Sequence, residues 1–414
     1  MHISSIGLDK YIKVKQIPRT YKYRLKPTEQ QRVFMEKHFG CTRFIYNHFL
    51  SERKRQYDES GKSDRFYEQC KALTELKKQP DTAFLNEVNS NSLVYSLRCL
   101  DNAYQNFFKH GSGFPRFKSK NRLKDSFTSP QPATNKIKGN KLYIPKFKEG
   151  IECIVSREIK GEVRTVTISK TPTGKYFAAI LTLEQIEPKE KTGAVIGVDL
   201  GIKDFAITNE GTTYPNNKYT KKYSKKLATA QKHLSRKKKG SNSFESQKRK
   251  VARIHEKIAN ARKDNLHKVS TQLIDEYDLI AIEDLNVKGM VKNHKLAKSI
   301  SDMGWGMFVE MLQYKANWYD KQVVKIDRFY PSSKTCSECG WKNKDLSLSD
   351  REWKCGGCGT VVDRDVNAAQ NILEQGLKKT SGGSLDNTDG GEYKTSKEFI
   401  PAERLPTKSG VHLK

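Results

Sequence analysis

Four of the chain's eight cysteines stand in two pairs whose spacing is typical of a metal site. They follow a C-x2-C-x15-C-x2-C pattern and are Cys336, Cys339, Cys355 and Cys358. Four thiolates at this spacing bind zinc tetrahedrally and leave no ligand position for a substrate. Gly340 and Gly359 follow the pairs and would permit tight knuckle turns. We therefore expect a structural zinc ion, with a redox role for the CxxC pairs as the alternative.

Three acidic residues lie where apolar segments end. Asp199 closes "AVIGVD", Glu283 closes "LIAIE", and either Asp365 or Asp363 opens the last helical segment. A carboxylate at the end of a buried strand is costly unless a cation or hydrogen bonds compensate it. A single such acid is readily explained as a turn or cap residue. Three in one α/β region favour a carboxylate cluster that holds Mg²⁺, and two such ions about 3.5–4 Å apart can promote phosphodiester hydrolysis.

Net charge indicates the class of partner. The 414 residues carry a formal charge of +30, which favours an anionic partner, and nucleic acid is the usual one. A membrane surface is the alternative, but the basic residues are spread over most of the chain instead of one amphipathic helix. Residues 221–263 alone hold 16 Lys and Arg against two Glu, a net of +14. This concentration favours contact with a nucleic-acid backbone over a merely solvated face.

Aromatic residues alternate with basic ones in "FIYNHFLSERKRQY" and "GFPRFKSK". Such surfaces can stack bases and neutralise phosphates, although Phe44, Tyr46 and Phe49 would equally suit a hydrophobic core. The candidate nucleic-acid contacts are Arg43, Tyr46, Asn47, Arg116, Lys118, Lys120, Lys237, Lys238, Lys239, Lys248, Arg249 and Lys250.

The elements that must position these residues follow from periodicity. Residues 11–25 alternate like a strand, and Thr28 with Gln31 predicts a capping box at the start of a helical region. Residues 138–186 alternate again, so one β domain is interrupted by helices. From residue 193 the pattern is α/β, with one long helix whose apolar face carries Val251, Ile254, Ile258, Leu266, Val269 and Leu273.

Several protein classes are disfavoured. No run of eighteen apolar residues occurs and the N-terminus lacks a signal peptide's apolar stretch, so we expect a cytoplasmic, nucleoid-associated prokaryotic protein without a membrane partner. The four scattered cysteines are expected to be buried thiols. No Ser-His-Asp arrangement or phosphate-binding glycine loop competes with the acids.

The motifs together resemble a known family. They are "YRLKPTEQQ", "GCTRFIYN", "GFPRFKSK", "GVDLGIKDFAIT", "IAIEDLNVKGM", "WGMFVEMLQYKA", "TCSECG" and "CGTVVDRDVNAAQNI". From about residue 20 to residue 375 the chain resembles the TnpB (OrfB-type) proteins of insertion sequences, relatives of the miniature type V CRISPR effectors. The resemblance implies an RNA-guided DNA endonuclease with catalytic acids Asp199, Glu283 and Asp365 binding magnesium. Its implied partners are a guide RNA and double- and single-stranded target DNA next to a short adjacent motif.

The resemblance also implies a multi-domain α/β architecture. Its expected parts are a split β-barrel wedge domain at 1–27 and 126–188, a helical recognition domain at 28–125, a RuvC (RNase H-like) nuclease domain at 189–330 and 362–377, a zinc-binding target-nucleic-acid module at 331–361, and a disordered tail at 378–414. The alternatives are a nuclease-inactive, RNA-guided DNA-binding repressor and a transposase accessory protein. The presence of all three acids argues against the repressor.

Overall fold

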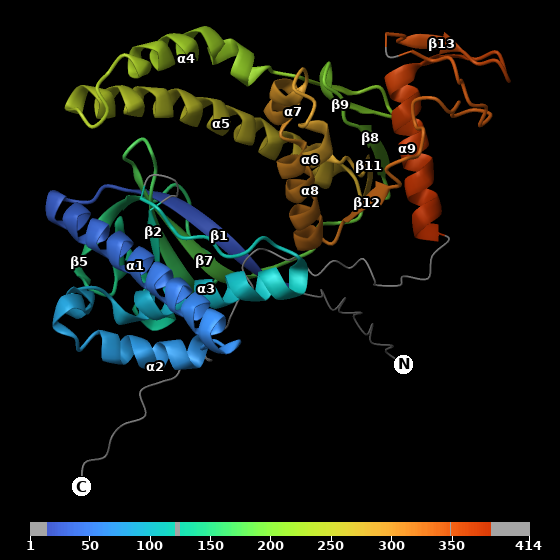
Figure 1. Cartoon of the computed structure of the whole chain (residues 1–414). Coiled ribbons are helices and arrows are strands. Elements are labelled where there is room, and N and C mark those ends of the chain that lie inside the picture. Colours follow the sequence, from blue (N-terminus) through green and yellow to red (C-terminus); the bar gives the residue numbers. More distant parts are fainter. Residues whose placement is uncertain (1–14, 121–124, 348, 382–414) are drawn as a thin grey trace, which may run out of the picture. The chain divides into compact units, whose positions relative to one another are not determined.

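The computed structural model describes residues 15–120, 125–347 and 349–381 (Figure 1). These residues form two compact units, which divide between residues 15 and 16 and again between residues 185 and 186. The second division falls just before residues 188–192, which contain neither helix nor strand. The predicted tail is corrected at its start, because α9 (Arg364–Ser381) continues through residues 378–381. The rest of that tail, and residues 1–14, lie outside the described residues.

The first unit contains a seven-stranded sheet. Its strand order is β2-β6-β7-β1-β5-β4-β3, so the first strand lies between two strands more than a hundred residues later. This confirms that the helices interrupt one β domain, whereas closure of the sheet into a barrel stays a prediction. The strands are β1 (Lys15–Leu25), β2 (Ser126–Ser129), β3 (Lys136–Lys138), β4 (Lys141–Ile144), β5 (Phe147–Ile154), β6 (Glu162–Lys170) and β7 (Tyr176–Ile186).

Three helices of this unit follow the first strand: α1 (Glu29–Ser60), α2 (Phe66–Leu76) and α3 (Ser90–His110), with short 3-10 turns at Pro80–Asn86 and Pro132–Thr134. Thr28 and Gln31 form the predicted capping box at the start of α1. Met35 and Phe39 in the first half of α1 join the core of the sheet, whereas Ile45 in its second half joins the core of the helices. Helix α1 therefore contributes to two hydrophobic cores, that of the sheet and that of the helices.

The second unit is organised around a five-stranded sheet of order β10-β9-β8-β11-β12. Its strands are β8 (Val195–Asp199), β9 (Asp204–Thr208), β10 (Thr213–Pro215), β11 (Leu279–Glu283) and β12 (Gln322–Ile326). The pairs β8–β9 and β9–β10 are antiparallel, whereas β8–β11 and β11–β12 are parallel. Asp199 and Glu283 are the last residues of their strands, as the sequence predicted.

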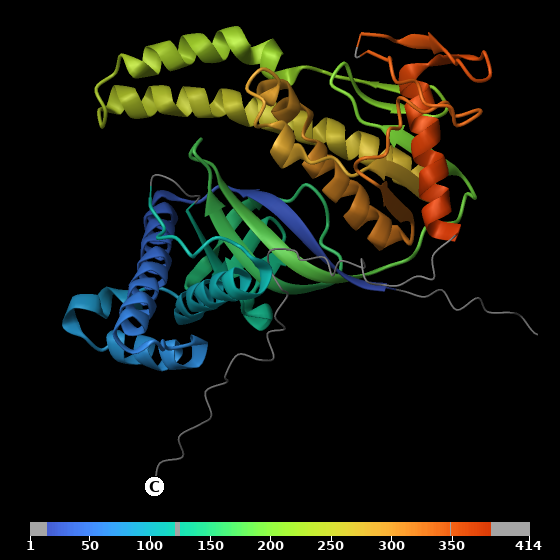
Figure 2. The ribbon, with the colours of Figure 1, turned by 45° about the vertical axis from the view of Figure 1, so that its right-hand side comes forward.

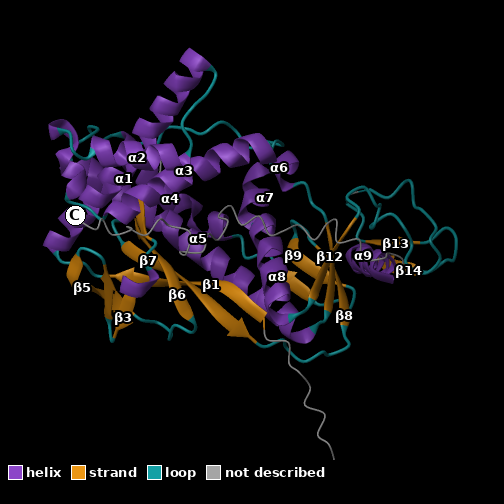
Figure 3. Ribbon diagram, turned by 90° about the horizontal axis from the view of Figure 1, so that it is seen from below, coloured by secondary structure: helices purple, strands orange, loops and turns teal. Residues whose placement is uncertain are grey.

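Helices cover both faces of this sheet, and Figure 3 shows α8 (Trp305–Tyr319) and α9 on opposite sides of the strands. Alternate residues of β11 face opposite layers. Ile280 and Ile282 belong to the core formed with α5 (Asn242–Glu276) and α8, whereas Leu279 and Ala281 pack with Ile372 of α9. The second unit is thus a three-layer structure, and two strands of its central sheet end in the acids Asp199 and Glu283.

The remaining elements of this unit are peripheral to the sheet. Helix α4 (Tyr219–Ser235) runs beside the first half of α5, and the two form a long hairpin (Figures 1 and 2). Short helices α6 (Val287–Met290) and α7 (Ala297–Met303) precede α8, and the two-stranded ribbon of β13 (Glu352–Lys354) and β14 (Val361–Asp363) precedes α9. Among the described residues, no helix is both long and apolar enough to cross a membrane.

Candidate functional site

Asp199 and Glu283 lie side by side at one edge of the sheet. Strands β8 and β11 are parallel and pair Val198 with Ile282, so the next residue of each strand is an acid. The chain leaves β8 toward β9 on one side of the sheet, whereas β11 is followed by a crossover to β12 on the other side. Ligands of open α/β sheets bind at such a switch point, beyond the carboxyl ends of the strands.

The third acid comes from α9, which packs unusually close to the sheet. A Cβ atom on Gly197 of β8 would lie 2.1 Å from the carbonyl oxygen of Ala369, so only glycine fits at this strand position. On the helix side, Ala368 and Ala369 are fully buried. Small residues on both sides therefore bring the first turn of α9, with Asp365, to the edge that carries the other acids.

The electrostatics indicate that the three carboxylates share one environment. Burial, followed by the negative charges of Glu283 and Asp365, raises the pKa of Asp199 to about 7. Burial also raises the pKa of Glu283, and the hydroxyl of Ser332, which donates a 2.5 Å hydrogen bond to its Oε1 atom, partly opposes this shift. The negative charge of ionised Asp199 is thus poorly compensated by the protein's own groups.

These residues fit a hard divalent cation, which would be held through carboxylate oxygens of Asp199, Glu283 and Asp365. A cation would relieve the repulsion that raises the Asp199 pKa. Within the described residues, however, the oxygens of the three acids do not all lie within 4.8 Å of one another. Asp365 instead forms a 3.1 Å ion pair with Arg351. The acids therefore share an edge without already forming a closed cage.

The structure separates the roles of the two aspartates in "VVDRDV". The Oδ1 atom of Asp363 accepts hydrogen bonds from the backbone N–H groups of Asp365 and Val366, each at 2.9 Å. Asp363 is therefore the N-terminal cap of α9. Asp365 lies inside the helix and is the aspartate of this pair whose charge acts on Asp199.

The four predicted zinc ligands meet in space. All four Sγ atoms lie within 4.8 Å of one another, with Cys336 to Cys358 at 3.8 Å and Cys339 to Cys355 at 3.5 Å. Tetrahedral zinc with bonds of about 2.3 Å requires sulfur–sulfur distances of roughly 3.8 Å, so the thiols fit this ion.

Both knuckles close with the turn that the sequence predicted. Gly340 and Gly359 adopt positive φ angles of 77° and 79° and donate to the carbonyls of Cys336 and Cys355. Hydrogen bonding to Thr360 lowers the pKa of Cys358 to about 6, which favours the thiolate that a zinc ion needs.

Four candidate nucleic-acid residues of the first unit take part in contacts within the protein, between α1 and the segment that follows α3. Asn47 of α1 exchanges two hydrogen bonds with the backbone of Lys118, and the Lys118 ammonium lies 3.9 Å from the ring centre of Tyr46. Tyr46 is buried, as the core alternative expected, and Arg43 pairs with Asp125. Their role toward nucleic acid stays a prediction.

The same loop presents other side chains to solvent. Arg116 and Lys120 are exposed, and so are the rings of Phe114 and Phe117 in the same loop. This arrangement combines basic groups with accessible aromatic faces, the composition that suits single-stranded nucleic acid.

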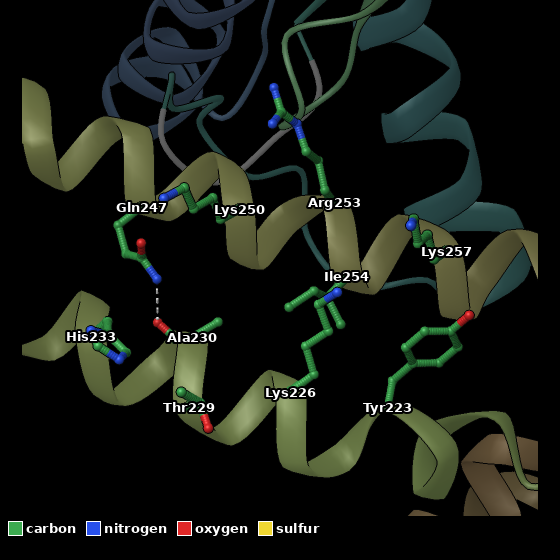
Figure 4. Close-up of a pocket in the computed structure, with 10 residues that line it drawn as sticks. All are labelled: Tyr223, Lys226, Thr229, Ala230, His233, Gln247, Lys250, Arg253, Ile254 and Lys257. Carbon is green, nitrogen blue, oxygen red and sulfur yellow. Dashed lines mark hydrogen bonds between the residues drawn. The ribbon is translucent and has the colours of Figure 1, made fainter.

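The α4–α5 hairpin carries the remaining six candidates, all of them exposed: Lys237, Lys238, Lys239, Lys248, Arg249 and Lys250. Helix α4 buries no residue fully, and Gln247 ties the two helices together by donating to the carbonyl of Ala230 (Figure 4). A groove of about 600 Å³ runs between the helices, and its lining includes Lys226, Arg253 and Lys257. The hairpin is therefore an exposed basic arm with a basic groove along it.

Sequence reasoning missed three polar residues beside the acids and the zinc knuckle: Ser332, Asn367 and Asn371. Ser332 contacts Glu283, and both asparagines are buried on the packed face of α9. The signal was present in "VNAAQNI", where two polar residues four positions apart lie on the same helix face as apolar ones.

Three family models match parts of the chain. One described as "Probable transposase" (OrfB_IS605) matches residues 178–294, a "Cas12f1-like, TNB domain" matches 305–372, and a "Helix-turn-helix domain" matches 17–62. The last segment folds here as strand β1 and the single continuous helix α1. The second match includes both zinc knuckles and Asp365, and the first includes Asp199 and Glu283.

Curated relatives match nearly the whole chain. A Streptomyces pristinaespiralis protein named "Putative RNA-guided DNA endonuclease" is 38% identical over 96% of this chain and 99% of its own length. The Escherichia coli K12 protein "Putative RNA-guided DNA endonuclease InsQ" is 33% identical over 86% of this chain and 92% of its own. A Cas12f1 chain solved with an sgRNA and target DNA covers 86% of this chain at 12% identity and a TM-score of 0.47. With whole-length relatives at this identity, the chain belongs to the TnpB family, the OrfB-type proteins of insertion sequences.

Proposed function

We propose that this protein is an RNA-guided DNA endonuclease that cleaves target DNA next to a short adjacent motif by magnesium-dependent phosphodiester hydrolysis. The observation that carries the proposal is the edge of the five-stranded sheet, where Asp199 and Glu283 end neighbouring parallel strands and Asp365 approaches on α9. The names of the whole-length relatives support the same activity. The sheet with its two helical layers supports the RuvC-type, RNase H-like nuclease domain implied by the resemblance.

In this proposal each acid has a distinct task. Asp199, whose pKa is raised by burial and by the neighbouring carboxylates, would lose its proton and serve as an anionic ligand when cations bind. Glu283 is oriented by the Ser332 hydroxyl, and Asp365, which is paired with Arg351 in this structure, would hold a cation in place of that ion pair. Magnesium ions held by these oxygens would supply an activated water and stabilise the leaving oxygen of the scissile phosphodiester.

We propose that the basic arm of α4 and α5 binds the guide RNA along its phosphate backbone. Its exposed lysines and arginines are spread over both helices and the turn between them. They therefore suit the regularly spaced phosphates of a nucleic-acid backbone better than a single bound phosphate. Figure 4 shows Tyr223 and Lys226 both directed from α4 toward α5, with Lys226 ending beside Ile254, which gives the groove an aromatic wall and a cationic rim. The exposed loop with Arg116 and Lys120 is proposed as a second contact in the recognition and wedge regions.

The decisive experiment uses the full chain expressed with its native flanking DNA. RNA that co-purifies is sequenced, and cleavage is measured on DNA that contains the matching target in Mg²⁺. We expect cleavage by the wild type and none by Asp199→Ala, with target binding retained in both. Wild-type binding without cleavage would favour the nuclease-inactive repressor instead, and absence of bound RNA would contradict RNA guidance altogether.

The zinc site has its own test. We expect one zinc ion per chain by elemental analysis and a loss of that zinc in Cys339→Ser, because three thiolates hold the ion far more weakly than four. Cleavage should fall while the circular dichroism of the sheet and helices is retained. Cys70→Ser, which removes a thiol in the helical core, is the matched control and should keep the zinc. Zinc-free wild-type protein purified without chelators would contradict the assignment.

A further inference from the structure

Helix α9 carries two buried asparagines that neither the zinc knuckles nor the acid cluster accounts for. Asn367 and Asn371 are four residues apart and are 3% and 1% exposed. Their neighbours on the packed face are Ala368, Ala369 and Ile372, which are apolar. Burying an amide among apolar groups is costly unless it is hydrogen-bonded, so the partners of these amides show what they do.

Both amides hold the chain around the first zinc ligand. Asn367 donates from Nδ2 to the carbonyl of Thr335 at 2.7 Å and accepts at Oδ1 from the N–H of Ser337 at 2.8 Å. Thr335 and Ser337 are the residues on either side of Cys336. The side chain of Asn367 therefore fixes the backbone on both sides of Cys336. Asn367 belongs to α9, two residues after Asp365.

Asn371 connects the segment around Cys336 to the edge of the sheet where Glu283 lies. Its Nδ2 atom donates to the carbonyls of Thr335 at 2.6 Å and Ser332 at 2.8 Å. The hydroxyl of Ser332 donates in turn to Oε1 of Glu283 at 2.5 Å. Ser332 is thus held through its backbone by α9 while its side chain orients a carboxylate on β11. Three segments far apart in the sequence meet in this chain of hydrogen bonds.

We propose that Ser332, Asn367 and Asn371 form a positioning clamp. Through its hydrogen bonds, α9, the helix that carries Asp365, fixes the orientation of the Glu283 carboxylate and the backbone of the Cys336 knuckle. The clamp rests on the proposed function, because it requires the acids to bind catalytic cations. None of its members is a metal ligand in this proposal. Outer residues that orient metal ligands typically contribute 10–100-fold to metal affinity, so the clamp is measurable without cleavage.

The clamp differs in its consequences from ordinary buried hydrogen bonding. If the amides only satisfied carbonyls, each substitution would lower stability and affect both metal sites in the same way. In the clamp, Ser332 acts on Glu283 alone, Asn367 acts on the knuckle alone, and Asn371 acts on both through Ser332 and Thr335. The three substitutions therefore give three different patterns.

The experiment measures both sites in the full-length protein–RNA complex. Mn²⁺ binding is followed by electron paramagnetic resonance, and the signal that the Asp199→Ala complex lacks is taken as the acid site. The rate of zinc release to a colorimetric chelator reports on the knuckle. Ser332→Ala should weaken Mn²⁺ binding about 10-fold and leave zinc release within twofold of the wild type. Asn367→Ala should speed zinc release about 10-fold with Mn²⁺ affinity nearly unchanged, and Asn371→Ala should alter both.

Two further variants complete the design. Ser332→Thr keeps the hydroxyl and should retain Mn²⁺ affinity within about threefold, whereas Gln370→Ala, an exposed position of α9, should change neither readout. Wild-type affinity in Ser332→Ala, or equal effects of all three clamp substitutions on both sites, would overturn the clamp alone. If the wild type shows no Asp199-dependent Mn²⁺ binding, the proposed acid site fails and the clamp falls with it.

Discussion

At the scale of single residues, the structure assigns different tasks to side chains that look alike in the sequence. Asp363 and Asp365 are two residues apart, yet one caps α9 and the other acts on the charge of Asp199. Position relative to the helix start decides between them, because only the residue before the first turn can accept from its free N–H groups.

This difference predicts different losses. Asp365→Ala should abolish magnesium-dependent cleavage while guide-dependent target binding survives, since it removes a proposed metal ligand. Asp363→Ala should retain part of the activity and lower the free energy of unfolding by about 1 kcal/mol, the usual value of a helix cap. Cleavage assays, binding assays and thermal melts on both variants check this. A dead Asp363→Ala beside an active Asp365→Ala would show that the aspartates are assigned the wrong way round.

A second residue-scale feature is the buried histidine of α1. His38 is fully buried among Phe34, Phe127 and Phe147; its Nδ1 atom donates to the Phe34 carbonyl and its Nε2 atom accepts from the N–H of Asn89. Burial, aided by the positive charge of Lys146, lowers the pKa of His38 to about 4. The ring is therefore a neutral structural group, although histidines on helices are often suspected of chemistry.

The lowered pKa predicts how the first unit responds to acid. The unfolded chain takes up the proton below about pH 6.5 and the folded one only near pH 4, so the histidine's contribution is complete above pH 6.5 and is lost as pH falls toward 4. The loss should be on the order of 3 kcal/mol at most. Urea unfolding between pH 4 and 7.5 measures it. His38→Phe should flatten this dependence, whereas His255→Phe on the exposed face of α5 should leave it unchanged.

At the scale of elements, the contact between α9 and β8 decides whether the third acid reaches the sheet edge. Gly197 leaves no room for a side chain beneath Ala369, and on the helix Gly376 similarly faces Ala281, where an added Cβ would lie 2.6 Å from the alanine's own. Two glycines thus permit the close packing of helix on sheet. The distance of Asp365 from Asp199 depends on this packing and not on either acid.

Gly197→Ala should therefore displace α9. We expect a loss of about 1–3 kcal/mol in the free energy of unfolding, as for other overpacked cores, together with reduced Mg²⁺-dependent cleavage. Gly306→Ala is the matched control, because an added Cβ there meets no atom within 4 Å and the position lies on the exposed side of α8. It should be neutral or slightly stabilising. Equal behaviour of the two variants would contradict the packing argument.

At the scale of the whole molecule, charge is distributed unevenly along the chain. Nearly half of the net +30 lies within residues 221–263, which form most of the α4–α5 hairpin. Each phosphate neutralised by a basic residue releases counterions, so the salt dependence of RNA affinity reports how many such contacts exist. The contributions of local contacts and of overall charge to RNA affinity can therefore be separated. The test compares substitutions that remove the same number of charges from different parts of the protein.

We expect Lys237, Lys238 and Lys239 changed together to Gln to weaken guide RNA binding and to lower the slope of log Kd against log salt by about 1 per lost contact. The matched triple, Lys136, Lys138 and Lys141 to Gln on exposed strand positions of the first unit, removes the same charge. This control triple should change the slope of log Kd against log salt less than the triple substitution in the basic arm does. Filter binding at several salt concentrations measures both. Identical slopes for the two triples would mean that net charge, not the basic arm, governs binding.

The sequence by itself determined the features that depend on near neighbours. The strand-end positions of Asp199 and Glu283, the cysteine spacing and the Thr28 capping box are set within a few residues, so periodicity and spacing predicted them correctly. The choice of Asp363 as a cap is equally local.

Only the tertiary structure decided which distant groups meet. The burial of Tyr46, the ion pair of Asp365 with Arg351 and the link from Asn371 through Ser332 to Glu283 each join residues that are separated in the sequence. No spacing rule relates such residues, because their meeting depends on how helices and strands pack. In this protein that packing is the close approach of α9 to the sheet, which two glycines permit and which brings the zinc knuckle, the clamp and the acids together.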